Sequence, residues 1–147
     1  METKIPPPIV TLIFIFLIAF SNRLVEPFST EYQLPLGVVI IICGLSVLIS
    51  AARVFKQLET TINPMQPSQA SKLAIIGPFK YTRNPMYLGM SIMLMGFGLI
   101  FGAKLTICLV ALFVLYITFF QIMPEERAMQ EKFTDWKDYC SKVRRWL

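Results

Sequence analysis

Long apolar stretches separated by short polar segments dominate the hydrophobic pattern of this chain. Between Arg83 and Glu125 the only charged side chain is that of Lys104. This span is long enough to cross a hydrocarbon layer of about 30 Å twice, at roughly 20 residues per crossing. The pattern therefore predicts two membrane helices, over residues 86–103 and 105–123.

Two further apolar stretches lie in the N-terminal part of the chain. Residues 36–55 carry a single charge, on Arg53, whose long side chain can extend to the membrane surface. Residues 8–25 are shorter in purely apolar content, and a cleaved signal peptide is the alternative for them. We favour a membrane helix, because one lysine and one glutamate precede it and no clear cleavage site follows. The sequence thus predicts an all-α integral membrane bundle of four transmembrane helices, in a single domain over residues 1–147.

The placement of lysine and arginine predicts the orientation of this bundle, because cytoplasmic segments retain positive charge. With a cytoplasmic N-terminus, twelve of the fourteen lysines and arginines lie on the cytoplasmic side, and only Arg23 and Lys104 lie outside. We therefore expect a multi-pass protein with both termini and residues 56–85 in the cytoplasm.

Composition narrows the classes of function. The net charge is +5, but the basic residues flank apolar spans, so we expect attraction to anionic lipid rather than to nucleic acid. The chain has no histidine, which excludes Ser-His and Cys-His catalysis and histidine-based metal sites. The three cysteines, Cys43, Cys108 and Cys140, are too scattered for a disulfide framework or a zinc site. We expect no metal ion.

The segment GPFKYTRNPMYLG, residues 77–89, ends a polar stretch that four prolines break. Gly77-Pro78 favours a turn, and Asn84-Pro85 is typical of a helix start. Such a start presents backbone N–H groups and the positive end of the helix dipole beside Arg83, where an anionic group would bind favourably. The alternative is that the basic and aromatic residues only anchor the chain at the membrane interface.

Glycines recur in the next predicted span, at Gly89, Gly96, Gly98 and Gly102. No strand precedes them, which argues against a nucleotide-binding loop. They favour a surface for close helix packing.

The C-terminal segment begins with Glu125 and Glu126, directly after Pro124. Apolar residues then recur at intervals of four and three, as on one face of an amphipathic helix: Met129, Phe133, Trp136, Cys140 and Val143. We expect this helix on the cytoplasmic membrane surface, with Pro124 bending the chain and the glutamate pair at the mouth of the bundle. Alternatively, the two glutamates only stabilise a helix N-terminus, by about 0.3–1 kcal/mol each.

Together the polar segments resemble a known family. GPFKYTRNPMYLG, two apolar spans and EERAMQEKFTDWKDYCSKVRRWL are similar to the isoprenylcysteine carboxyl methyltransferases, including small bacterial members, and to the related phospholipid N-methyltransferases. The resemblance covers about residues 71–147. It implies a methyltransferase that uses S-adenosyl-L-methionine at the cytoplasmic face, with cofactor segments at about 71–89 and 124–147.

The resemblance also implies roles for single residues. Arg83, Tyr87 and Glu126 are candidates for catalysis. Cofactor contacts are implied for Ser71, Lys72, Leu73, Ala74, Phe79, Asn84, Pro85, Met86, Tyr87 and Glu125. These residue types suit the cofactor, because a carboxylate can accept hydrogen bonds from both hydroxyls of a ribose and aromatic rings can face a sulfonium.

The methyl acceptor is less constrained by the sequence. Methyl transfer needs mainly alignment with water excluded, so a carboxylate acceptor needs no base and suits a chain without histidine. We favour such a group on a lipid-like or isoprenoid-type acceptor. The alternative, an amine of a phospholipid head group, needs a proton acceptor, for which Tyr87 and Glu126 are candidates. Eukaryotic prenyl-protein enzymes have an arginine facing the substrate where this chain has Gln121. A non-catalytic module that binds lipid or a partner helix is the alternative of another class.

Overall fold

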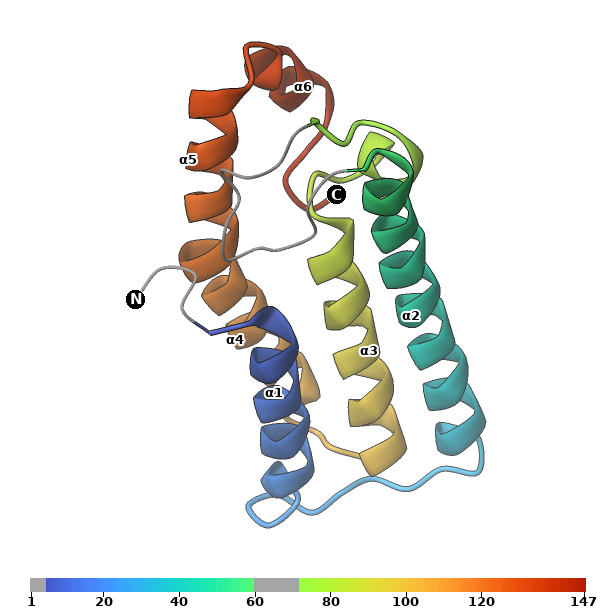
Figure 1. The fold of residues 1–147 in the computed structure, drawn as a ribbon. Helices are drawn as coiled ribbons and strands as arrows, with labels where there is room; N and C mark the ends of the chain where they lie inside the picture. Colours follow the sequence, from blue (N-terminus) through green and yellow to red (C-terminus); the bar gives the residue numbers. More distant parts are fainter. Residues whose placement is uncertain (1–4, 60–71) are drawn as a thin grey trace.

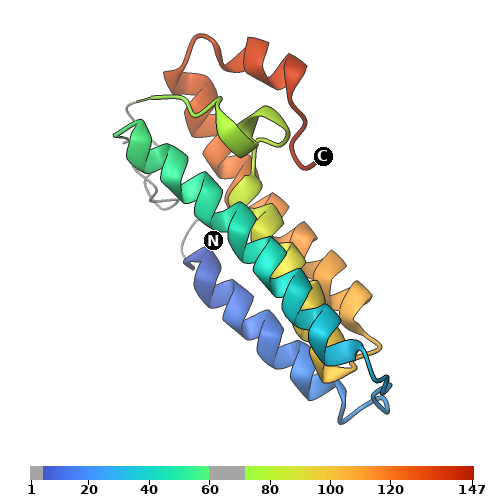
Figure 2. The ribbon, with the colours of Figure 1, turned by 90° about the vertical axis from the view of Figure 1, so that its right-hand side faces the viewer.

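The computed structural model describes residues 5–59 and 72–147, and these ranges are helical with no strand. The elements are α1 (Pro7–Ser21), α2 (Gln33–Gln57), the 3₁₀ turn η2 (Gly77–Lys80), α3 (Pro85–Phe101), α4 (Thr106–Ile117), the π-helical segment η3 (Thr118–Ile122), α5 (Met123–Lys132) and α6 (Trp136–Lys142). Helices α1 to α4 lie along the long axis of the molecule, whereas η2, α5 and α6 gather at one end (Figure 1, Figure 2).

Two helices are long and apolar enough to cross a membrane. One is α2, and the other is the continuous helix Thr106–Lys132, which α4, η3 and α5 form together. Helices α1 and α3 are also apolar but have only 15 and 17 residues. All four predicted spans are therefore helical, and only the last one ends far from its predicted boundary.

Glycines let α2 and α3 approach closely. A Cβ atom on Gly44 would lie 2.6 Å from the backbone oxygen of Gly89, and one on Gly96 would lie 2.8 Å from the backbone oxygen of Gly37. Any side chain there would push the helices apart, so the prediction of close packing is confirmed for these positions. Gly102 has another role, because it ends α3 in the left-handed conformation, with φ of 64°.

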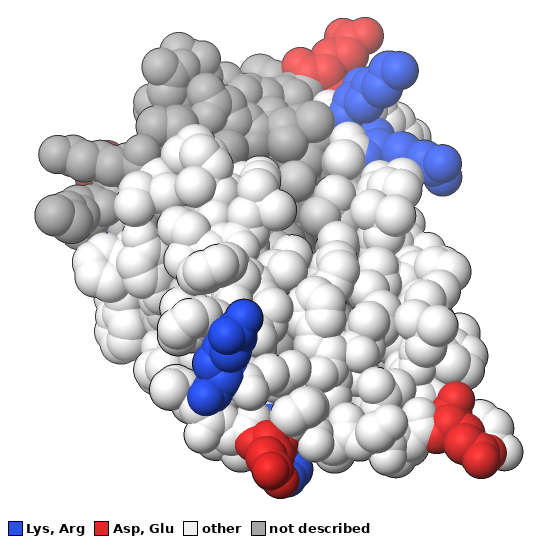
Figure 3. Space-filling model, turned by 90° about the horizontal axis from the view of Figure 1, so that it is seen from below, with Lys and Arg blue, Asp and Glu red and all other residues white. Residues whose placement is uncertain are grey.

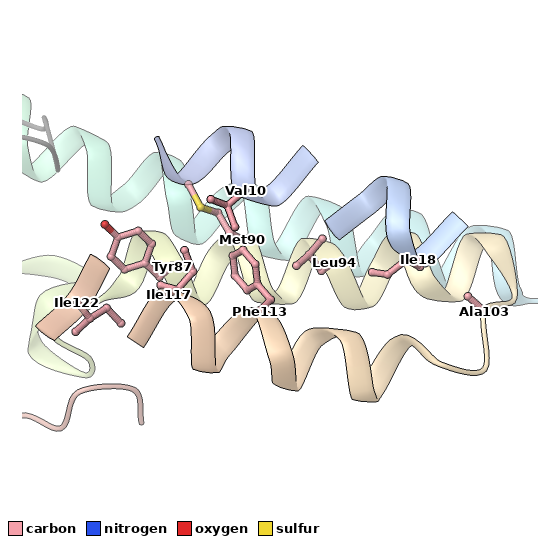
Figure 4. Packing of buried hydrophobic residues seen from close by; sticks show 9 residues of the cluster. All are labelled: Val10, Ile18, Tyr87, Met90, Leu94, Ala103, Phe113, Ile117 and Ile122. Carbon is pink, nitrogen blue, oxygen red and sulfur yellow. The ribbon is translucent and has the colours of Figure 1, made fainter. Parts of the chain in front are cut away.

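Helix α3 is the central helix and contacts α1, α2 and α4. The main apolar core lies between α1, α3 and α4, with Ala103 at one end and Tyr87 and Ile122 at the other (Figure 4). The outer faces keep large apolar side chains exposed, among them Leu12, Phe16, Ile42, Leu112 and Phe119. Such faces are suited to contact with lipid rather than water.

The helix is not interrupted at Pro124, where the sequence predicts a bend. The helix of α4 continues through η3 and Pro124 into α5. Proline is tolerated there because it lies in the first turn of α5, directly after the π-helical segment has changed the hydrogen-bond register.

The prediction of a single amphipathic helix for the C-terminal segment is wrong. The helix ends at Lys132, Phe133 is extended, and α6 begins only at Trp136. The apolar stripe nevertheless shares one cluster, in which Trp136, Tyr139 and Val143 are buried and Met129, Phe133 and Cys140 pack against them. Leu73 also packs against this cluster, so the apolar stripe contacts the segment that precedes η2.

The two ends of the molecule differ in charge. The end with α5 and α6 carries most of the described lysines and arginines. The opposite end, where residues 22–32 and 102–105 connect the helices, contains Arg23 and Lys104. Seen from that end, the described surface consists largely of uncharged residues, drawn in white, with a few acidic and basic side chains (Figure 3). The direction in which the bundle crosses a membrane remains a prediction.

Candidate active site

The two polar segments that the sequence singled out meet beside the central helix. The hydroxyl of Tyr87, in the first turn of α3, donates a hydrogen bond to Oε1 of Glu125 in α5. Tyr87 is buried and Glu125 is partly buried. The pair therefore links the start of α3 to the glutamate pair across 38 residues of sequence.

Glu126 faces two arginines instead. Its Oε1 lies 3.2 Å from Nη2 of Arg83, and its Oε2 accepts hydrogen bonds from Nε (3.1 Å) and Nη2 (2.6 Å) of Arg145. The side chains of Arg83 and Glu126 are only 13% and 14% exposed, so this ion pair is largely removed from water. The hydrogen bonding of Arg145 to the carboxylate of Glu126, which accepts, raises the pKa of Arg145. Neighbouring glutamates thus have different surroundings: Glu125 contacts a neutral hydroxyl and Glu126 contacts two cations.

After α6 the chain returns toward the start of α3 as an extended strap, residues 144–147 (Figure 1). Three hydrogen bonds join the strap to the turn before α3: Arg83 N to Arg144 O (3.0 Å), Thr82 Oγ1 to Arg145 O (3.1 Å) and Asn84 Nδ2 to Arg145 O (3.0 Å). A fourth, from Trp146 Nε1 to Thr118 Oγ1 (3.1 Å), joins the strap to η3. The strap therefore holds the turn and the π-helical segment together.

This contact changes the role expected for Asn84. It occupies the N-cap position of α3 with Pro85 as the first helical residue, as predicted, but its side chain makes no capping hydrogen bond. The amide donates to the strap instead. Among residues 5–59 and 72–147 no side chain caps α3, so the backbone N–H groups of its first turn are suited to binding a ligand.

The other residues implied as cofactor contacts lie apart from the Tyr87–Glu125 pair. Ala74 and Phe79 are buried in a cluster with Ala51 and Val54 of α2, and Met86 packs against it. Leu73 packs against the cluster around Trp136, Lys72 is exposed and Pro85 is buried. Ser71 lies outside the described residues. The described geometry thus joins Tyr87 with Glu125, and Arg83 with Glu126, and places Leu73, Ala74, Phe79 and Met86 in two apolar clusters.

A pocket of about 340 Å³ opens beside Glu126. Its polar and aromatic lining comes from the turn before α3, from α5, from α6 and from the strap: Arg83, Glu126, Arg127, Gln130, Trp136 and Arg145. The guanidinium of Arg83 lies over the ring of Trp136, 5.8 Å from its centroid. No residue implied as a cofactor contact lines this pocket.

Reasoning from sequence missed Arg145, Trp146 and Tyr139. The hydroxyl of Tyr139 donates to the backbone oxygen of Phe79 at 2.7 Å and fixes η2, and burial raises the pKa of Tyr139. The segment VRRWL, residues 143–147, could have indicated these contacts. Arginine is suited to a forked ion pair with a carboxylate, and tryptophan is suited to burial with one hydrogen bond from its ring nitrogen.

Comparison with known proteins extends these observations. A family model described as phospholipid methyltransferase matches residues 32–135, a range that includes Tyr87 and both glutamates. An uncharacterized protein of Haemophilus influenzae is 41% identical over 63 residues, which are 42% of this chain and the whole of that protein. No solved structure matches the chain.

Proposed function

Because the chain belongs to the phospholipid methyltransferase family, we propose that it is an integral membrane enzyme that methylates an amphiphilic, lipid-like acceptor with S-adenosyl-L-methionine. Family membership supports methyl transfer, and two helices long enough to span a membrane support the location. The main observation in favour of this site is the hydrogen bond between Tyr87 and Glu125, because it joins the two segments implied to bind the cofactor.

In this proposal the four crossings are α1, α2, α3 and the helix that α4 and η3 form together, and the end with α5, α6 and the strap lies in the cytoplasm. Helices of 15 and 17 residues are about 22 and 26 Å long, so α1 and α3 need flanking residues or a thinner bilayer to span it. The concentration of basic residues at the α5 end supports the cytoplasmic assignment.

The residues present fit the cofactor. One oxygen of Glu125 accepts from Tyr87, which leaves the other suited to a ribose hydroxyl. The uncapped first turn of α3 offers N–H donors for the carboxylate of the methionine part. When bound, S-adenosyl-L-methionine supplies a methyl group already activated by its sulfonium.

The geometry supports an amine of a lipid head group as the methyl acceptor. An ammonium must lose a proton before it can attack, and a chain without histidine needs another acceptor. The hydroxyl oxygen of Tyr87 would take this proton while its own proton moves along the existing hydrogen bond to Glu125. The neutral amine left by this proton transfer would be the nucleophile toward the methyl group that the cofactor would supply. Glu126, which two guanidinium groups engage, holds the arginines in place.

A carboxylate of a lipid-like or isoprenoid-type molecule is the second candidate. The resemblance to isoprenylcysteine carboxyl methyltransferases favours it, and such an acceptor needs no base. Gln121, which is buried in η3 and donates to the backbone oxygen of Ile5 at 2.7 Å, takes the place of their substrate-facing arginine. An uncharged residue there fits an ammonium better than a carboxylate.

The experiment uses the purified full chain in phosphatidylethanolamine vesicles with methyl-labelled S-adenosyl-L-methionine. We expect label in the organic extract that resists mild alkali, as an N-methyl group does. Release of volatile methanol would identify an ester and the second candidate. Label found only in water-soluble products would contradict a lipid-like acceptor.

A matched pair of variants tests the role of Tyr87. Tyr87→Phe should reduce transfer to an amine by roughly 10²-fold or more, the usual contribution of a general base, while cofactor binding remains. Tyr81→Phe removes a hydroxyl from an exposed tyrosine of the same segment and should leave the rate unchanged. Equal rates for both variants would exclude the proton relay.

A further inference from the structure

The pocket beside Glu126 is distinct from the Tyr87–Glu125 pair but adjacent to it. Two of its lining residues, Arg83 and Glu126, lie four residues before Tyr87 and one residue after Glu125. The remaining lining comes from α5, α6 and the strap. A molecule confined to the pocket therefore contacts neighbours of the Tyr87–Glu125 pair in sequence, but no described residue implied to hold the cofactor.

The pocket has a positive lining. Three arginines and one glutamate line it, which gives a formal charge of +2. Glu126 accepts two hydrogen bonds from Arg145 and forms an ion pair with Arg83. Nε of Arg83 is buried and has no hydrogen-bond partner in the described part of the chain. Guanidinium groups present several N–H donors in one plane, which matches the oxygens of a phosphate.

The two neighbouring sites suit the two ends of one head group. The pocket is positive, and the adjacent pair offers the hydroxyl oxygen of Tyr87 as a hydrogen-bond acceptor. A zwitterionic head group has a phosphate and an amine separated by two carbon atoms, so it could place its phosphate among the arginines and its amine at Tyr87. The face of Trp136 gives the pocket an apolar wall for the adjoining carbon atoms.

We propose that this pocket binds the phosphate of the lipid acceptor and thereby positions its amine at Tyr87. The inference rests on the proposed function, because it assigns a second part of the same head group. It makes Arg83, Arg127 and Arg145 determinants of acceptor specificity. A lipid amine without a phosphate would then be a poor substrate even if it reached Tyr87.

Gln130 gives a test that leaves the arginines intact. It is exposed on α5 and lines the pocket, so Gln130→Glu and Gln130→Lys change the local charge in opposite directions. Lys137→Gln is the matched control, because it changes the net charge by the same amount as Gln130→Glu at an exposed position of α6 outside the pocket.

The measurement is calorimetric binding of dihexanoyl phosphatidylethanolamine to the full chain in detergent, with dodecylamine as a phosphate-free probe. Gln130→Glu should weaken lipid binding by roughly three- to fivefold, the effect of one partly screened charge, and Gln130→Lys should strengthen it. Binding of dodecylamine and of S-adenosyl-L-methionine should not change, nor should lipid binding to Lys137→Gln.

Each other outcome overturns the inference. If Gln130→Glu weakens only cofactor binding, the anion in the pocket is the carboxylate of the cofactor. If all variants bind the lipid equally, the pocket holds no phosphate. Inorganic phosphate, added as a competitor, should displace the lipid weakly but not dodecylamine. Because binding needs no turnover, a phosphate site that responds to Gln130 would stand even if the labelling experiment detected no methyl transfer.

Discussion

At the scale of single residues, the two glutamates that follow Pro124 are neighbours in sequence with different interaction partners. Glu125 lies against a tyrosine hydroxyl, whereas Glu126 lies between two arginines. Adjacent helical residues point in different directions, so the two carboxylates meet different partners. Two residue-scale predictions follow from this division.

Glu125→Gln should weaken the binding of S-adenosyl-L-methionine by about 1.5–3 kcal/mol, the scale of hydrogen bonds to a charged group. The amide oxygen can still accept from Tyr87, so the fold should persist. Titration calorimetry measures the affinity, and Glu131→Gln, an exposed glutamate of α5, is the control. Unchanged affinity in Glu125→Gln would remove this residue from the cofactor site.

Arg145→Ala should destabilise the protein, because Glu126 would lose its forked partner while remaining mostly buried. The side chain of Arg145 is 37% exposed, so solvent screening reduces the expected loss to about 1 kcal/mol. Arg144→Ala is a close control, since that neighbouring side chain is exposed and contributes its backbone oxygen instead. Unfolding midpoints in detergent would show the difference, and equal midpoints would contradict it.

At the scale of elements, the contact between α2 and α3 depends on the absence of side chains. Gly96→Ala places a methyl group within 2.8 Å of a backbone oxygen of α2, so the helices must separate. We expect a loss of roughly 1–3 kcal/mol, the usual cost of overpacking. Ala111→Val adds volume at an exposed position of α4 and should be nearly neutral. Equal thermal stability of both variants would show that α3 can shift without cost.

At the scale of the whole molecule, the charge difference between its ends predicts the direction of insertion. Ser141→Cys and Glu31→Cys, each in a chain without its three native cysteines, place a thiol at opposite ends. An impermeant thiol reagent applied outside intact cells should label only the position at Glu31. Labelling at position 141 alone would reverse the orientation and would place the proposed site outside the cell.

Much of the helical architecture could be predicted from sequence, whereas the candidate site could be predicted only in part. Apolar runs and glycine positions are local properties, and they correctly indicated the apolar helices and a closely packed surface on α3, though not that α2 is its partner. The start of α3 at Asn84-Pro85 is equally local. The roles of Phe79 and Ala74, which pack beside α2, could not be read from their neighbours in sequence.

The sequence by itself determined that the chain is helical, where its apolar helices lie and that its basic residues gather at one end, because burial preference, helix signals and charge are properties of short segments. Only the tertiary structure decided the partners of the glutamates and of Asn84. Arg145 reaches Glu126 across 19 residues and Asn84 contacts the strap across 61, because the chain reverses after α6. Contacts of this kind depend on the path of the whole chain. The helix ends before Phe133, and this break lets the residues that follow fold back toward α3.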